Sequence, residues 1–173
     1  MKALSVAQAQ EGELGSVKED NLAMEIKRVT PVLGAEIIGV DLSKPLSNAE
    51  FDAVHDAFVT HSVLIFRDQD LSAQNMIDFS HRFGPLMIHV LKESLLDGHP
   101  EIYKLSNRRT KGKSEGRAYA GQYWHSDLTY EPRPSLGSLL YGIEVPEIGG
   151  DTLFASTAHA FETLSPSLQT MLE

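Results

Sequence analysis

The chain has 173 residues, 42% of them hydrophobic, which is enough for one domain with a sizeable core. Its 24 acidic and 15 basic side chains give a formal net charge of −9, which argues against a nucleic-acid partner because duplex binding usually needs a basic face. Cysteine is absent, which excludes disulfides and thiolate metal sites, and no long apolar run or leader pattern indicates a membrane partner or export, so we expect a cytoplasmic location.

The N-terminal stretch differs in character from the rest of the chain. Residues 1–22 are polar and show no apolar period, so we expect a disordered or mobile tail there. We expect residues 23–173 to form the N-terminal portion of a single domain. The beginning of that portion is β-prone and is interrupted by Pro31, Gly34 and Gly39, which favours short strands joined by turns.

Two helices are predicted from their caps. Ser47 is followed three residues later by Glu50, a capping-box signature, and the apolar residues behind it share one helical face. Ser72 opens a second helix, which Gly-Pro stops after an apolar stripe. Between the two helices, the apolar run 63–66 predicts a buried strand.

The second half of the chain reads as strands and loops. Strands are predicted at 101–105, 123–130 and 136–145, and another around 152–154. Residues 107–120 hold five basic side chains and one acidic one with no periodicity, which indicates a loop. Together with the helices, these strands predict a β-dominated α+β domain.

The end of the chain is predicted to be helical. Residues 156–164 form a short helical stretch, and Ser165 followed by Pro166 is typical of a helix start. The apolar stripe of that last helix would have little to cover it in a domain that stopped at Glu173. We therefore expect the chain to be truncated at its C-terminal end.

The residues that point to chemistry are His125 and Asp127. Side chains at i and i+2 of a strand lie on the same face, so this pair offers an imidazole nitrogen and a carboxylate oxygen to one metal ion. Two histidines and one carboxylate on one face of an octahedron form the facial triad of non-haem iron(II) oxygenases, which leaves three positions open. The third ligand must come from outside this strand. The alternative to a metal site is a surface or core histidine that is hydrogen-bonded to its neighbour.

These residues lie within a series of stretches that resembles one family in order and in sequence. The resemblance is to the taurine dioxygenase and 2,4-dichlorophenoxyacetate dioxygenase family, which depends on iron(II) and 2-oxoglutarate. It covers nearly the whole chain from about residue 24. The matching stretches are 34–42 (GAEIIGVDL), 63–69 (VLIFRDQ), 83–86 (FGPL), 124–127 (WHSD) and 149–154 (GGDTLF).

The resemblance implies a fold and a set of site residues. The fold would be a double-stranded β-helix, or jelly roll, with flanking helices. His125 and Asp127 would be the first two iron ligands, with 2-oxoglutarate as co-substrate and O2 as oxidant. Thr152 would hydrogen-bond a carboxylate of 2-oxoglutarate, or else simply fill a strand. His89 would bind substrate, or else be a solvated loop histidine.

The chain also departs from the family pattern. Lys92 and Gly121 replace a tyrosine and an asparagine of taurine dioxygenase, which puts taurine itself in doubt. The family's second histidine ligand and its 2-oxoglutarate-binding arginine lie beyond the length of this chain. His159 follows Asp127, but we expect it on a helix surface rather than on the metal.

The resulting functional expectation is a dioxygenase that hydroxylates a small, anionic organic substrate and releases succinate and CO2. The basic loop 107–120 would either guide the anion or simply be solvated. Two alternatives stay open: a truncated, non-catalytic family member that acts as a binding module, and a metal-binding jelly roll of cupin type. The substrate and the oligomeric state are left open, and a homo-oligomer is compatible with the sequence.

Overall fold

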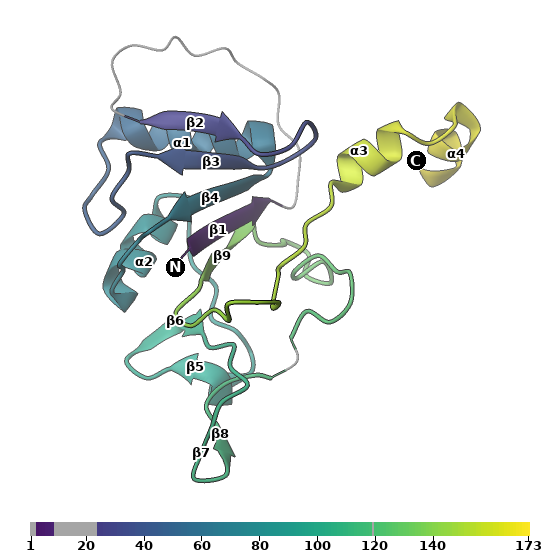
Figure 1. Cartoon of the computed structure of the whole chain (residues 1–173). Helices are drawn as coiled ribbons and strands as arrows, with labels where there is room; N and C mark the ends of the chain where they lie inside the picture. The colour runs from purple at the N-terminus through teal and green to yellow at the C-terminus, as the bar shows by residue number, and fades with distance from the viewer. Residues whose placement is uncertain (1–2, 9–23, 119) are drawn as a thin grey trace.

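The main sheet of the protein has five strands, which the computed structural model places in the order β2-β3-β4-β1-β9 (Figure 1). The structure describes residues 3–8, 24–118 and 120–173. Helices and strands are mixed, as expected, but among the described residues strands do not predominate, so the expected β-dominated composition is not found. The strands of this sheet are β1 (Ala3–Gln8), β2 (Glu25–Arg28), β3 (Ala35–Ile38), β4 (Val63–Arg67) and β9 (Gly137–Tyr141).

The sheet is mostly antiparallel. Only β3 and β4 run parallel, in register Ala35 to Leu64, and the helix α1 (Asn48–His61) makes the crossover between them. β2 pairs antiparallel with β3, and β1 pairs antiparallel with both β4 and β9. The sheet therefore joins the beginning of the described chain to a strand near residue 140.

Strand β1 corrects the expectation of a mobile tail over residues 1–22. Residues 3–8 pair along their length with β4 on one side and β9 on the other, so their backbone groups are satisfied within the sheet. The pairing partners lie about sixty and more residues away, and a search for local periodicity cannot detect them. Residues 1–2 and 9–22 of the expected tail lie outside the described part of the chain.

The two predicted helices are confirmed, together with their caps. In α1, the Ser47 hydroxyl accepts from the amide of Glu50, and the Glu50 carboxylate accepts in return from the amide of Ser47. In α2 (Ala73–His81), Ser72 makes the same reciprocal pair with Asn75. These caps satisfy amides that an uncapped first turn would leave unpaired.

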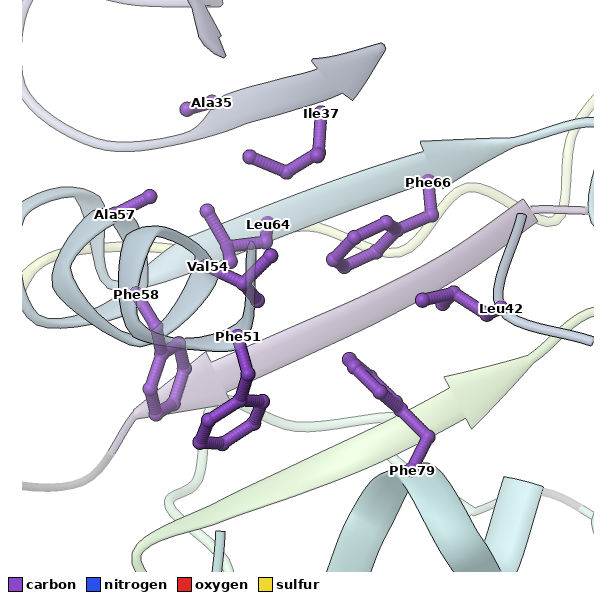
Figure 2. Close-up of a cluster of buried hydrophobic side chains, with 10 residues drawn as sticks. All are labelled: Ala35, Ile37, Leu42, Phe51, Val54, Ala57, Phe58, Leu64, Phe66 and Phe79. Carbon is purple, nitrogen blue, oxygen red and sulfur yellow. The ribbon is translucent and has the colours of Figure 1, made fainter. Parts of the chain in front are cut away.

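The core lies between the main sheet and the two helices (Figure 2). Phe58 of α1 is 1% exposed, and Leu64 and Phe66 of β4 are 0% exposed. Side chains of β3, α2 and the loop after β3 complete the cluster, which is made of Ala35, Ile37, Leu42, Phe51, Val54, Ala57, Phe58, Leu64, Phe66 and Phe79. The helices therefore cover one face of the sheet.

The remaining elements lie outside this core. A short helix η1 (Lys92–Ser94) precedes a two-stranded sheet of β5 (Leu95–Leu96) and β6 (His99–Tyr103). The strand predicted at 101–105 is thus present as β6, shifted by two residues. The helices α3 (Thr157–Glu162) and α4 (Pro166–Leu172) extend away from the sheet (Figure 1).

The loop predicted over 107–120 contains a small hairpin. β7 (Arg109–Thr110) pairs with β8 (Lys113–Ser114) across a two-residue turn. Lys111 and Gly112 have φ values of 51° and 80°, as the tight turn of a two-residue hairpin requires. The lysine–glycine pair was the signal for this turn, and its flanking strands are too short to show alternation.

The surface of the second half carries many apolar side chains. Ile148 is 92% exposed, and Met171 in the apolar stripe of α4 is 72% exposed. Such a large apolar surface is unusual for a monomeric domain. Among the described residues, no helix is long and apolar enough to cross a membrane.

Candidate metal centre

The segment that holds His125 and Asp127 is irregular, so the strand predicted at 123–130 is wrong. Gly121 and Leu128 have φ values of 71° and 55°, which an extended chain does not adopt. A turn follows, in which the amide of Glu131 donates to the carbonyl of Leu128 at 2.9 Å. Pro132 and Pro134 come next, and because proline has no amide donor, the sequence here cannot continue a ladder.

His125 is nevertheless oriented toward Asp127. Its Nδ1 lies 2.7 Å from the carbonyl oxygen of Tyr123, so the Nδ1–H donates to that carbonyl and Nε2 carries the free lone pair. Nε2 in turn lies 3.3 Å from Oδ1 of Asp127. The nitrogen and the oxygen that would bind a metal therefore face one another.

Asp127 has a second fixed contact, which comes from the main sheet. The hydroxyl of Ser138, in β9, donates to Oδ2 of Asp127 at 2.6 Å. Sequence reasoning missed Ser138. The available signal was its position in the alternation of 136–145, where it lies on the face opposite to Leu139 and Tyr141, the two β9 residues that pack on the core.

The geometry of the pair fits a metal ion. Two donor atoms each about 2.1 Å from an ion and at right angles to one another lie about 3 Å apart, close to the 3.3 Å between Nε2 and Oδ1. The donor set, one imidazole and one carboxylate, suits iron(II) and its divalent neighbours. The His125 and Asp127 side chains are 53% and 55% exposed, so other ligands can reach the ion.

The described residues provide only part of a metal site. Among them, no group of three or more histidine, aspartate or glutamate side chains could hold one ion. His159 lies on the exposed surface of α3, where its Nδ1 is 3.7 Å from Glu162, and it is not brought to the pair.

Gly121 lies directly beside the candidate metal-binding histidine. A Cβ built at this position would be 3.5 Å from Cε1 of His125, which is ordinary van der Waals contact. A Cβ at residue 121 would therefore touch the edge of the imidazole without a clash, and it is the φ of 71° that favours glycine there.

His89 is held by two contacts. Its Nδ1 accepts a hydrogen bond from the amide of Leu91 at 3.0 Å, and its ring stacks on Tyr103 with 4.3 Å between centroids. Because Nδ1 accepts, the neutral ring carries its proton on Nε2 and can donate from there. The Tyr103 hydroxyl is buried and has no hydrogen-bond partner within the part of the chain that the structure describes.

Thr152 is exposed, and the strand predicted around 152–154 is absent from the described structure. An isolated strand is not stable without a neighbour, and no described strand pairs with these residues. Among the described residues, no hydrogen bond or ion pair joins Thr152 or His89 to the His125–Asp127 pair.

Comparison with protein families shows to which family this chain belongs. The family model described as "Taurine catabolism dioxygenase TauD, TfdA family" matches residues 25–173. The chain belongs to this family. The resemblance expected from the five sequence stretches is thus confirmed over all but the first 24 residues.

Individual dioxygenases of the TauD/TfdA family are also similar to this chain in sequence. An alpha-ketoglutarate-dependent sulfonate dioxygenase of Saccharomyces cerevisiae is 32% identical over 165 residues, which are 90% of this chain and 39% of the relative. An alpha-ketoglutarate-dependent 2,4-dichlorophenoxyacetate dioxygenase of Cupriavidus pinatubonensis is 32% identical over 153 residues, which are 83% of this chain and 53% of the relative.

A solved structure supports the fold. The crystal structure of a taurine dioxygenase from Burkholderia xenovorans superposes with a TM-score of 0.71 at 29% identity, covering 87% of this chain and 51% of that one. The chain spans about half the length of the curated relatives that it matches.

Proposed function

We propose that the protein is an iron(II)- and 2-oxoglutarate-dependent dioxygenase. The observation that carries the proposal is the 3.3 Å distance between His125 Nε2 and Asp127 Oδ1. The other polar atom of each side chain, Nδ1 of the histidine and Oδ2 of the aspartate, is already hydrogen-bonded. This arrangement presents one nitrogen and one oxygen to a single ion, as a facial triad requires of two of its members. Family membership supports the same assignment.

Iron(II) bound there would supply oxidation by O2, coupled to conversion of 2-oxoglutarate to succinate and CO2, and the substrate would gain a hydroxyl group. The protein would contribute the orientation of the ligands and open coordination positions. Tyr123 holds the imidazole in the tautomer that leaves Nε2 free, and Ser138 holds the carboxylate.

Two further residues complete the proposal within this chain. We assign Thr152 to a carboxylate of 2-oxoglutarate on the family resemblance, and the exposed position of the residue is compatible with this role. We assign His89 to the substrate on the family resemblance, and its neutral ring, with Nδ1 accepting from the amide of Leu91, carries a donor at Nε2 for this role. A donor there suits an anionic group, and relatives are named for sulfonates, sulfate esters and 2,4-dichlorophenoxyacetate.

The rest of the site would come from outside these 173 residues. The described residues bring no third ligand to the pair, and the relatives are about twice as long. We propose that a longer protein supplies the second histidine, an arginine for 2-oxoglutarate and the strands that complete a jelly roll. Those strands would cover the exposed apolar side chains of the second half.

The decisive experiment compares four variants of the full-length protein. His125→Ala and Asp127→Ala are made beside His159→Ala and Asp52→Ala, which remove the same groups from exposed helix positions. Anaerobic titration with Fe(II) measures metal binding, and succinate formation measures turnover. We expect the first two variants to lose both, by about a hundredfold or more, and the controls to keep both.

Each other outcome has a definite meaning. Full turnover in both His125→Ala and Asp127→Ala would refute the metal site. Metal binding by the unaltered protein without succinate formation, over a panel of sulfonates, sulfate esters and phenoxy acids, would favour the non-catalytic binding module. Loss of metal in His159→Ala would place a third ligand on α3 and contradict the separation of His159 from the His125–Asp127 pair.

A further inference from the structure

We propose that Ser138 is a positioning residue that keeps the Asp127 carboxylate monodentate, with Oδ1 directed to the metal and Oδ2 held by the serine hydroxyl. The inference rests on the proposed metal site and extends it to a residue outside the ligand motif. Its basis is the pair of distances at the two carboxylate oxygens: 3.3 Å from Oδ1 to His125 Nε2 and 2.6 Å from Oδ2 to Ser138 Oγ.

The hydrogen bond from Ser138 is a strong one by its geometry. Hydroxyl-to-carboxylate bonds of 2.5–2.7 Å are typical of an ionised acceptor, and the 2.6 Å distance lies within this range. Oδ2 of Asp127 is therefore occupied by Ser138, and Oδ1 faces Nε2 of His125. A metal that approaches the imidazole nitrogen meets Oδ1.

Ser138 is well placed to impose this orientation because β9 is anchored and the ligand segment is not. The β9 backbone pairs with β1, in register Ser138 to Ala7. Leu139, on the opposite face of β9, packs on the core, and so does Tyr141, which accepts from the amide of Leu71 at 3.1 Å. The segment around Asp127 has turns and no ladder, so its carboxylate needs a partner on a rigid element.

The number of oxygens that Asp127 gives to the metal matters for the reaction. A facial triad leaves three of six positions open only if its carboxylate binds through one oxygen. A carboxylate that bound through both would fill one of the positions needed by 2-oxoglutarate and O2. By occupying Oδ2, Ser138 would preserve the open position.

The test uses a pair of variants that differ in one group. Ser138→Thr keeps the hydroxyl and Ser138→Val replaces it with a methyl of similar shape, and both residues are favourable in a strand. Ser126→Ala is the matched control, because the Ser126 hydroxyl lies between the two ligands in sequence and makes no hydrogen bond among the described residues. All are made in the full-length protein.

The readouts are taken without 2-oxoglutarate or substrate. Mn(II) titration followed by the free-ion magnetic resonance signal measures affinity, and the visible absorption of the Co(II) form reports coordination number. We expect Ser138→Val to weaken Mn(II) binding about tenfold and to change the Co(II) spectrum. Ser138→Thr and Ser126→Ala should match the unaltered protein in both.

The outcomes separate this inference from the proposed function. If the unaltered protein binds Mn(II), His125→Ala does not, and Ser138→Val binds with the same affinity and Co(II) spectrum as Ser138→Thr, the role of Ser138 is overturned and the metal site stands. Equal weakening in Thr and Val variants would also overturn it, since the hydroxyl would not be the cause. If the unaltered protein binds no divalent metal, the metal site itself fails.

Discussion

The hydroxyl of Tyr141, near the end of β9, donates a hydrogen bond to the carbonyl oxygen of Gln69 at 3.2 Å. The same hydroxyl accepts from the amide of Leu71 at 3.1 Å. Residues 69–71 follow β4, and β1 lies between β4 and β9 in the sheet. Tyr141 therefore ties β9, which carries Ser138, to the chain leaving β4, independently of the ladders that join these strands through β1.

Replacement of Tyr141 by phenylalanine tests how much these two hydrogen bonds stabilise the protein. The variant loses the hydroxyl and leaves the carbonyl of Gln69 and the amide of Leu71 without it, which should lower the free energy of unfolding by about 1–2 kcal/mol. Urea denaturation measures the change. Tyr130→Phe, at a side chain that is 73% exposed, is the control and should change the free energy of unfolding by less than about 0.5 kcal/mol. Equal values for the two variants would show that the tie contributes nothing.

The Gln69 side chain makes a second, buried connection. It is 8% exposed, its Oε1 accepts from the amide of Leu42 at 2.8 Å, and its Nε2 donates to the carbonyls of Val40 and Arg67 at 3.0 Å and 2.9 Å. One amide group thus joins the loop after β3 to the end of β4. A side chain of the same length without amide atoms would leave the buried amide of Leu42 and the part-buried carbonyls of Val40 and Arg67 without this partner.

We predict that Gln69→Met lowers the free energy of unfolding by about 2–3 kcal/mol, since each orphaned buried group is costly. The matched control is Gln74→Met on α2, where the amide only pairs with Asp78 at 2.7 Å on the exposed surface. That change should be below about 0.5 kcal/mol. Equilibrium denaturation compares the two, and a loss at Gln69 no larger than that at Gln74 would contradict the buried role.

The features of the fold that could be predicted from the sequence are those that depend on residues close together in the chain. The capping pairs at Ser47 and Ser72 name the first residues of α1 and α2, because cap and partner are three residues apart. Strand β1 could not be found in this way. Its backbone is stabilised by β4 and β9, which lie far along the chain, and its own six residues are too few to show a period.

The candidate site shows the same division. His125 and Asp127 were predicted to share one face of a strand, and they do face one another, but in an irregular segment that leads into a turn. The residue types and their spacing were enough to predict that the two side chains lie together, although the predicted strand is absent. Ser138 was missed because the alternation of 136–145 places it on the face of β9 away from the core, but it cannot show that this face lies beside the ligand segment.

The basic hairpin of β7 and β8 gives a prediction about substrate charge. Its side chains are exposed, and its base is tied to the chain after β9 by an ion pair of 3.0 Å between Arg108 and Glu144. A double change, Lys111→Gln with Lys113→Gln, should lower kcat/KM for an anionic substrate about threefold at low salt and leave kcat unchanged. The difference should vanish at high salt, because exposed charges act over about a Debye length.

The control for the hairpin removes the same charge elsewhere. Lys27→Gln with Lys44→Gln takes two exposed positive charges from the main sheet and the loop after β3. If this pair lowered kcat/KM as much as the hairpin pair, net charge and not the hairpin would guide the substrate. A hairpin effect that persisted at high salt would indicate a direct contact.

The last prediction concerns pH and His61, the final residue of α1. Burial lowers the pKa of His61 from its ordinary value, and the nearby charge of Arg28 lowers the pKa further. The folded protein therefore binds fewer protons at His61 than the unfolded chain, once the pH falls below the ordinary value of 6.5. Above that value both states hold a neutral imidazole, and His61 adds no pH dependence.

It follows that the free energy of unfolding should fall as the pH is lowered from about 7.5 to about 5. His61→Gln removes the titrating group and should reduce this fall, while His55→Gln, on the same helix, should leave it in place. Urea denaturation at both pH values measures the difference. A fall of equal size in His61→Gln and the unaltered protein would mean that the acid sensitivity arises elsewhere, and that the folded state does not favour the neutral form of His61.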